Sequence, residues 1–115
     1  MDTLASYREI IQRILAEYTL IPYAYGELRC ETVFDVEQDR YLAMTLGWER
    51  GRRVHGCLLH LEIIDGYIWI QRDGTEEGVA LALTAASIPK DRIVLGFQPP
   101  EMRQYTDYAA VSELQ

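Results

Sequence analysis

The chain has 115 residues, 49% hydrophobic and 25% charged, a composition typical of one globular domain spanning residues 1–115. Its 18 acidic residues against 11 Lys and Arg give a net charge of −7, which argues against DNA binding by the whole surface, because such binding neutralises phosphates. No stretch approaches the ~18 apolar residues of a membrane span, and the N-terminus lacks a signal-peptide pattern, so we expect a cytoplasmic protein without membrane contact.

The first predicted element is an amphipathic helix from Asp2 to about Tyr18. Its apolar residues recur at spacings of three and four, at Leu4, Tyr7, Ile11, Ile14, Leu15 and Tyr18. Asp2 is a suitable N-cap, and the Ile21-Pro22 pair disfavours helix beyond residue 20. This helix needs an apolar surface on which to lie.

A β-hairpin is predicted around Asp65-Gly66, because a tight type I′ turn needs positive φ at both central residues. The resulting register pairs Ile63 with Ile68 and Leu61 with Ile70 on one face, and Glu62 with Trp69 and His60 with Gln71 on the other. The first face is apolar and the second is mixed, as expected for a sheet with one buried side.

The preceding strands are placed by their own loops. A loop at Arg50-Gly51 pairs Met44 with Cys57 and Leu42 with Leu59, which extends the buried face.

The earliest strand, residues 28–36, is joined through Glu37, Gln38 and Asp39. A three-residue loop there places Phe34 opposite Leu42 and Cys30 opposite Leu46, whereas a two-residue loop would bury Glu31 and Asp35. We expect the longer loop, because an unpaired buried carboxylate costs several kcal/mol.

The two cysteines, Cys30 and Cys57, then lie on strands separated by a third. Two strand spacings are about 9 to 10 Å, beyond the roughly 7 Å limit for a disulfide. We interpret both as small core residues in a reducing compartment.

The segment RDGTEE follows the fourth strand and has two interpretations. Asp73 and Glu76 form a D-x-x-E variant of the capping box, with Glu77 in the first turn of a helix that continues through Val79, Leu83 and Ala86 to Ile88-Pro89. The alternative is a carboxylate cluster with a chemical role. Beyond the helix, IVLGF predicts a short fifth strand whose place in the sheet is open, and residues 99–115 form an irregular Tyr-rich tail.

Several strings resemble one known family over essentially the whole chain. They are YREIIQRILAEY, IPYAYGE, GRRVHGCLLHLEIIDGYIWIQRDGTEEGVA, IPKDRIVLGFQPP and RQYTDYA. The chain resembles the XisI family, the fdxN element excision controlling factors of cyanobacteria. The resemblance implies a role, with a partner called XisH, in programmed excision of a DNA element during heterocyst differentiation, or in a related XisH-dependent process. It supplies no catalytic motif and no cofactor.

The residues themselves also favour a protein that is not an enzyme. Cys57 is expected to point to the core and His60 to the opposite face, which leaves no Cys/His pair. Two His and two separated Cys are too few for a metal site unless carboxylates supply most ligands. The enzyme alternative is a bound ion held by Asp73, Glu76, Glu77 and His60.

Two surfaces are candidate binding sites. Tyr67 and Trp69, on the face away from the predicted core, and the tail residues Tyr105 and Tyr108 could contact XisH or a second copy of this chain. The N-terminal helix packing over Tyr67 and Trp69 is an equally good interpretation.

The second candidate surface is a set of arginines that could contact DNA. It comprises Arg50, Arg52, Arg53 and Arg72, the first three at a hairpin end. The alternative is that these charges only keep the hairpin soluble.

The prediction is therefore an α+β domain. It has a mostly antiparallel sheet, a four-stranded meander plus a short fifth strand, with an N-terminal helix and a helix after strand four. We expect an accessory protein-binding factor in recombination control, with direct DNA contact and self-association left open.

Overall fold

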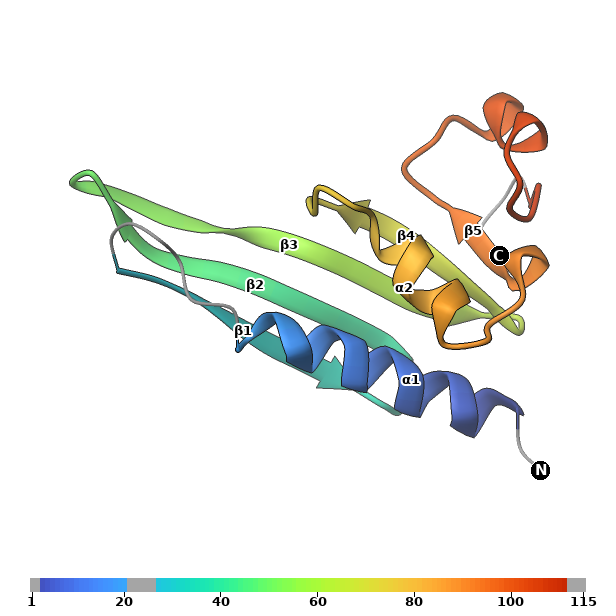
Figure 1. Cartoon of the computed structure of the whole chain (residues 1–115), viewed down its shortest axis with the longest axis horizontal. Coiled ribbons are helices and arrows are strands. Elements are labelled where there is room, and N and C mark those ends of the chain that lie inside the picture. The colour runs from blue at the N-terminus through green and yellow to red at the C-terminus, as the bar shows by residue number, and fades with distance from the viewer. Residues whose placement is uncertain (1–2, 21–26, 112–115) are drawn as a thin grey trace.

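Figure 1 shows the computed structural model, which describes residues 3–20 and 27–111. Its elements, in order, are α1 Thr3–Tyr18, β1 Glu27–Asp35, β2 Arg40–Glu49, β3 Arg52–Ile64, β4 Tyr67–Asp73, α2 Val79–Ala85, the 3-10 turn η1 Lys90–Arg92, β5 Ile93–Leu95 and the 3-10 helix η2 Pro100–Tyr105. The predicted α+β class is confirmed. The expected cap at Asp2 and the helix stop at Ile21-Pro22 lie outside the described residues.

The five strands form one open sheet in the order β1-β2-β3-β4-β5. The first four strands are an antiparallel meander, as predicted. β5 pairs in parallel with β4, with Ile93 beside Ile68, which settles the position that the sequence left open. A parallel pair needs a crossover connection, and α2 lies in that connection.

Both helices cover the same face of the sheet, called here the inner face (Figure 1). Helix α1 buries Tyr7, Ile11, Ile14 and Leu15 there, which confirms the predicted stripe. Each such side chain contributes about 1.5–3 kcal/mol when fully buried. Packing of this apolar face on the sheet therefore supplies most of the stability of α1, as is usual for an amphipathic helix in a protein. The opposite face is called the outer face.

The strand β3 carries one extra residue, Leu58, opposite the junction between Ala43 and Met44 of β2. On the turn side of this bulge Met44 pairs with Cys57 as predicted, but beyond it Ala43, not Leu42, pairs with Leu59. Ala43 is fully buried and Leu42 is only half-buried. The expectation that Leu42, Met44 and Cys57 belong to the core is therefore wrong, because their side chains lie on the outer face.

A second irregularity lies between β3 and β4. The Asp65-Gly66 hairpin and its pairs as far as Leu61 with Ile70 are confirmed. His60 pairs with Arg72 instead of Gln71, so Gln71 is the unpaired extra residue. Gly74 N–H donates to Leu58 O at 2.8 Å and joins the end of β4 to the first bulge.

The β1–β2 turn is one residue longer than predicted, and spans residues 36–39. Phe34 pairs with Tyr41 and Cys30 with Thr45, so the expected partners Leu42 and Leu46 are wrong. The longer turn is stabilised by Asp35 Oδ1, which accepts hydrogen bonds from the N–H groups of residues 37 and 38 at 3.1 and 3.0 Å. Cys30 is buried, as predicted, and both cysteines are free thiols.

The outer face of β4 and β5 is covered by the C-terminal segment, residues 96–111. Trp69, Val94 and Ala109 form a second small core there. Arg103, only 5% exposed, lies over the Trp69 ring at 5.1 Å. Its guanidinium donates to the carbonyls of Leu95, Gly96 and Val111 at 3.2, 3.2 and 2.9 Å. The tail is thus part of the fold, and the alternative that α1 covers Trp69 is wrong.

Helix α1 is fixed to the β1–β2 turn by one carboxylate. Arg8 Nε and Nη2 donate to the two oxygens of Asp39 at 2.7 and 3.1 Å, and the Tyr41 hydroxyl donates to Asp39 Oδ1 at 2.9 Å. The Arg8 hydrogen bonds hold the pKa of Asp39 below its usual value. Burial and the bond to Asp39 raise the pKa of Tyr41 to about 12.

We predict that Arg8→Gln destabilises the protein at neutral pH and much less in acid. The folded-state pKa of Asp39 is depressed, so its contribution is present above the unfolded value of about 3.9 and is lost as pH falls through the folded value. Urea unfolding of both proteins between about pH 7 and pH 2 measures this. The control is Arg13→Gln, on the exposed side of the same helix. A difference from wild type that stays constant down to pH 2 would contradict the assignment.

Candidate functional site

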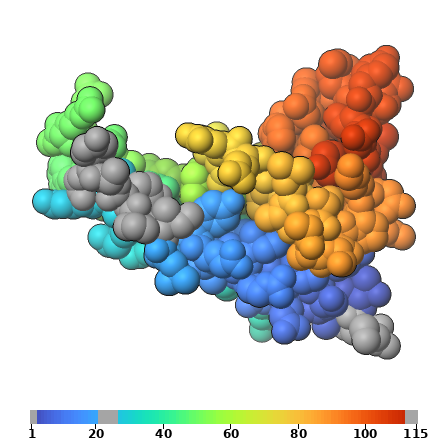
Figure 2. Space-filling model, in the orientation of Figure 1, coloured from blue at the N-terminus to red at the C-terminus, as the bar shows by residue number. Residues whose placement is uncertain are grey.

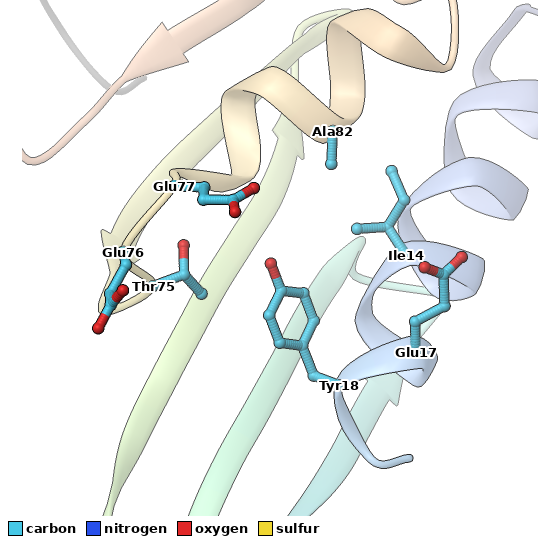
Figure 3. Close-up of a pocket in the computed structure, with 7 residues that line it drawn as sticks. All are labelled: Ile14, Glu17, Tyr18, Thr75, Glu76, Glu77 and Ala82. Carbon is cyan, nitrogen blue, oxygen red and sulfur yellow. The ribbon is translucent and has the colours of Figure 1, made fainter. Parts of the chain in front are cut away.

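An acidic pocket lies between the last turns of α1 and the loop before α2 (Figure 3). Its cavity volume is about 370 Å³, and it is lined by Ile14, Glu17, Tyr18, Thr75, Glu76, Glu77 and Ala82. In Figure 3 the Glu77 carboxylate points toward the pocket, whereas Glu76 points away from Tyr18. Burial raises the pKa of Tyr18, and the nearby carboxylates of Asp73, Glu77 and Glu17 raise it further. The pocket therefore disfavours anions.

The predicted ion-binding set is not brought together. Asp73, Glu76 and Glu77 lie around the start of α2 on the inner side, whereas His60 lies on the outer face of β3 beside Leu42. Among residues 3–20 and 27–111, no group of three His, Cys, Asp or Glu side chains could hold a metal ion. The enzyme alternative built on these four residues is wrong.

Asp73 caps α2, but not through the predicted capping box. Its Oδ2 accepts a hydrogen bond from Val79 N–H at 2.7 Å, and its Oδ1 accepts one from Thr75 N–H at 2.9 Å. The helix begins at Val79 after Gly78, whose φ is 91°, and so starts later than the spacing of Asp73 and Glu76 implies. Glu76 and Glu77 are exposed. A loop from Gly74 to Gly78 replaces the predicted first turn.

Cys57 and His60 share the outer face because of the bulge at Leu58, contrary to the expectation that they face apart. His60 Nε2 lies 3.0 Å from Glu62 Oε2, a distance typical of an ion pair, without hydrogen-bond alignment. The Cys57 thiol donates to Leu59 O at 3.2 Å, and burial raises its pKa. A thiol held in this way is not an activated nucleophile, because reactive cysteines need a lowered pKa.

Three of the four candidate DNA-contact residues lie together. Arg50, Arg52 and Arg53 are exposed at the end of the β2–β3 hairpin, and Arg53 stacks over Trp48 at 5.5 Å. Arg72 pairs with His60, about seven residues or roughly 23 Å along β3 from Arg53. Its Nε donates to Cys57 O at 2.8 Å. Arg72 is therefore separate from the hairpin cluster.

The aromatic candidates differ sharply in exposure. Trp69 is 2% exposed and lies under the C-terminal segment, so it is not a surface residue. Tyr67 is half-buried, with Arg92 over its ring at 5.2 Å, and Tyr108 packs against the inner core. Tyr105 is 76% exposed. Of the four, Tyr105 has the exposure that a partner contact requires.

The sequence reasoning missed other exposed apolar residues in the same segment, namely Phe97 and Met102, at 49% and 47%. Met102 and Tyr105 are three residues apart in η2, and such residues lie on one side of a 3-10 helix. Phe97, Met102 and Tyr105 are called here the C-terminal apolar cluster. The i, i+3 spacing of Met102 and Tyr105 was the available signal in the sequence. It indicates a shared side only within a helix, and an irregular tail was predicted for this segment.

The comparisons with known proteins identify the family. A family model described as XisI protein matches residues 1–110. The chain belongs to the XisI family. A crystal structure of a XisI-like protein from Anabaena variabilis ATCC 29413 is similar to this XisI chain with TM-score 0.83 and 33% identity, covering 95% of this chain and 100% of that one.

A second solved structure is that of the fdxN element excision controlling factor XisI from Anabaena variabilis ATCC 29413. It has TM-score 0.80 and 33% identity, and covers 96% of this chain and 100% of that one. The comparison with curated proteins gives no match. Within the described part of this XisI chain, no helix is long and apolar enough to cross a membrane.

We predict that Asp73→Ala lowers the free energy of unfolding by roughly 0.5–2 kcal/mol, the usual loss for a helix cap. Glu76→Ala should change it by less than about 0.5 kcal/mol, because Glu76 is exposed. Urea unfolding of both variants measures the difference. Equal losses of unfolding free energy at the two positions would contradict this assignment and support the predicted capping box.

Proposed function

We propose that this XisI chain is an accessory protein-binding factor that controls excision of a DNA element, or a related process, together with an XisH-type partner. The observation that carries the proposal is the family match over residues 1–110, joined to 33% identity with a structure of an fdxN element excision controlling factor. In this role the chain binds and positions other proteins, and the bond-breaking chemistry belongs to a separate recombinase.

The chemistry of the chain supports binding more than catalysis. Its net charge of −7 opposes general attraction to phosphates. The raised pKa of Cys57 keeps that thiol protonated. The carboxylates of Asp73, Glu76 and Glu77 lie apart from His60, so this His cannot act with them as an acid–base pair.

We propose the C-terminal apolar cluster as the contact for the XisH-type partner. Arg103 and Trp69 hold this segment against the sheet, so its exposed side chains are positioned before binding and lose little entropy on contact. Figure 2 shows the segment standing out from the helical layer at one end of the molecule. Aromatic residues and Met are enriched in the centres of protein interfaces.

The double variant Met102→Ala/Tyr105→Ala should weaken the complex with a co-expressed XisH-type protein at least tenfold, about 1.4 kcal/mol. Size-exclusion chromatography with light scattering, at about 0.1 M and about 1 M salt, measures complex formation. Leu81→Ala is the matched control, since Leu81 is an exposed apolar residue on α2. Failure of the wild-type chain to form any complex would overturn the proposed function, whereas an intact complex in the double variant would overturn only the contact.

The second candidate function is direct DNA contact by the β2–β3 hairpin. The observation that favours it is the exposure of Arg50, Arg52 and Arg53 at the end of the β2–β3 hairpin. This hairpin end lies at one extremity of the molecule (Figure 1). Three guanidinium groups at a projecting end could reach phosphates while the acidic body stays away.

On this second candidate, Arg50→Glu/Arg52→Glu abolishes retention of linear DNA in a gel-shift measurement, and wild-type affinity falls with salt by a slope of about −0.9 per phosphate contacted. The control is Arg13→Glu on α1, which makes the same change of charge at one exposed arginine away from the hairpin. Equal loss in the control would mean that total charge, rather than the hairpin, governs binding.

A further inference from the structure

One side chain, that of Arg103, joins the two ends of the C-terminal segment. At the end of β5 its Nε and Nη2 donate to Leu95 O and Gly96 O, both at 3.2 Å. At the other end of the segment its Nη1 donates to Val111 O at 2.9 Å. The two ends therefore lie close together, which is the geometry of a compact Ω-loop on the surface of a domain.

The chemistry of arginine suits this position. A guanidinium is always charged, so burying it is costly unless it is hydrogen-bonded, and Arg103 is only 5% exposed. The three carbonyls and the ring of Trp69, 5.1 Å away, offset that cost. The planar fork of the guanidinium donates in several directions at once, whereas a lysine ammonium is a compact point charge. The closed form of the segment therefore depends on Arg specifically.

Arg103 also determines which side of η2 faces outward. Residues three apart in a 3-10 helix lie on one side, so Met102 and Tyr105 share a side and Arg103 lies on another. With Arg103 held inward, Met102 and Tyr105 are 47% and 76% exposed. Helices of this type rarely run beyond three or four residues, and η2 has six, so we expect its geometry to depend on docking.

The segment packs mainly around a core of its own at the β5 end of the sheet (Figure 1). That core has three buried residues, Trp69, Val94 and Ala109, whereas α1, α2 and the sheet share the larger main core, which Tyr108 of the segment also contacts. The Ala109 N–H donates to Ile93 O of β5 at 2.9 Å. Regions with few buried apolar contacts open at a lower free energy than the main core.

We infer that the C-terminal segment opens and closes as a unit separate from the main core, that Arg103 is the positioning residue of the closed form, and that only the closed form presents the C-terminal apolar cluster. The apparent dissociation constant for a partner is then the intrinsic constant divided by the closed fraction. By linkage, a bound partner in turn favours closure. The role in partner binding rests on the proposed function, whereas the opening itself does not.

Amide hydrogen exchange on the full chain tests the opening. In wild type the Ala109 amide should exchange through an opening that is more populated and depends less on urea than the one that exposes the most protected amides of β3, because it uncovers less surface. In Arg103→Lys, exchange at Ala109 should be at least about tenfold faster while β3 stays protected, since bonds to a buried charge are lost. The control is Arg29→Lys, at an exposed position of β1, which should exchange like wild type.

Two results would overturn the separate opening. One is an Ala109 amide that is as protected as the slowest β3 amides and has the same urea dependence, which would make the segment and the sheet one cooperative unit. The other is loss of protection at Ala109 and throughout β3 together in Arg103→Lys, with circular dichroism showing an unfolded sheet.

A partner titration tests what the closed form does. In a Trp48→Phe background Trp69 is the one remaining tryptophan, and its quenching by acrylamide measures the closed fraction. The dissociation constant of Arg103→Lys for an XisH-type protein should rise by the factor by which the closed fraction falls. An open segment that binds as tightly as wild type overturns the presentation role. A wild type that binds no such protein overturns that role and the proposed function, while exchange at Ala109 still decides the opening.

Discussion

The single extra residue Leu58 in β3 determines which side of β2 faces the helices. Because of this bulge, Tyr41 and Ala43 lie on the inner face, opposite Leu61 and Leu59, and both are fully buried. Tyr41 then reaches the carboxylate of Asp39, to which Arg8 of α1 also binds. The same register shift places the side chains of Leu42 and Met44 on the outer face. A local departure from regular pairing thus joins the helical layer to the sheet and sets which β2 side chains face outward.

How much of this structure can be predicted from the sequence depends on how local the deciding interaction is. The face of α1 and the hairpin at Asp65-Gly66 follow from periodicity and turn chemistry, and both are confirmed. The bulge does not follow, because β2 reads YLAMTLGW and its larger apolar residues, Leu42, Met44, Leu46 and Trp48, all share one parity. Alternation therefore predicts that this face is buried and selects the wrong one. The capping box at Asp73 and Glu76 was wrong since a backbone bend at Gly78 delays the helix, and no short motif encodes that delay.

The candidate site shows the same limit. The sequence places Trp69 correctly on the face away from the main core, but its cover comes from Arg103, more than thirty residues later, through bonds to three carbonyls. The surface proposed for partner binding, the C-terminal apolar cluster, belongs to the segment docked on the outer face. The inner side holds the main core under two helices. The proposed division is a packed inner side and an outer side that binds other chains.

The central claim is that β2 turns Leu42 outward and Ala43 inward, and thiol labelling tests it most directly. In a background with Cys30 and Cys57 replaced, Leu42→Cys and Ala43→Cys are reacted with a maleimide under native conditions. Circular dichroism establishes that both variants are folded. The structure predicts fast labelling at position 42 and strong protection at position 43, which is fully buried. Protection at 42 with fast labelling at 43 would contradict the bulge and restore the regular register, with Leu42 in the core.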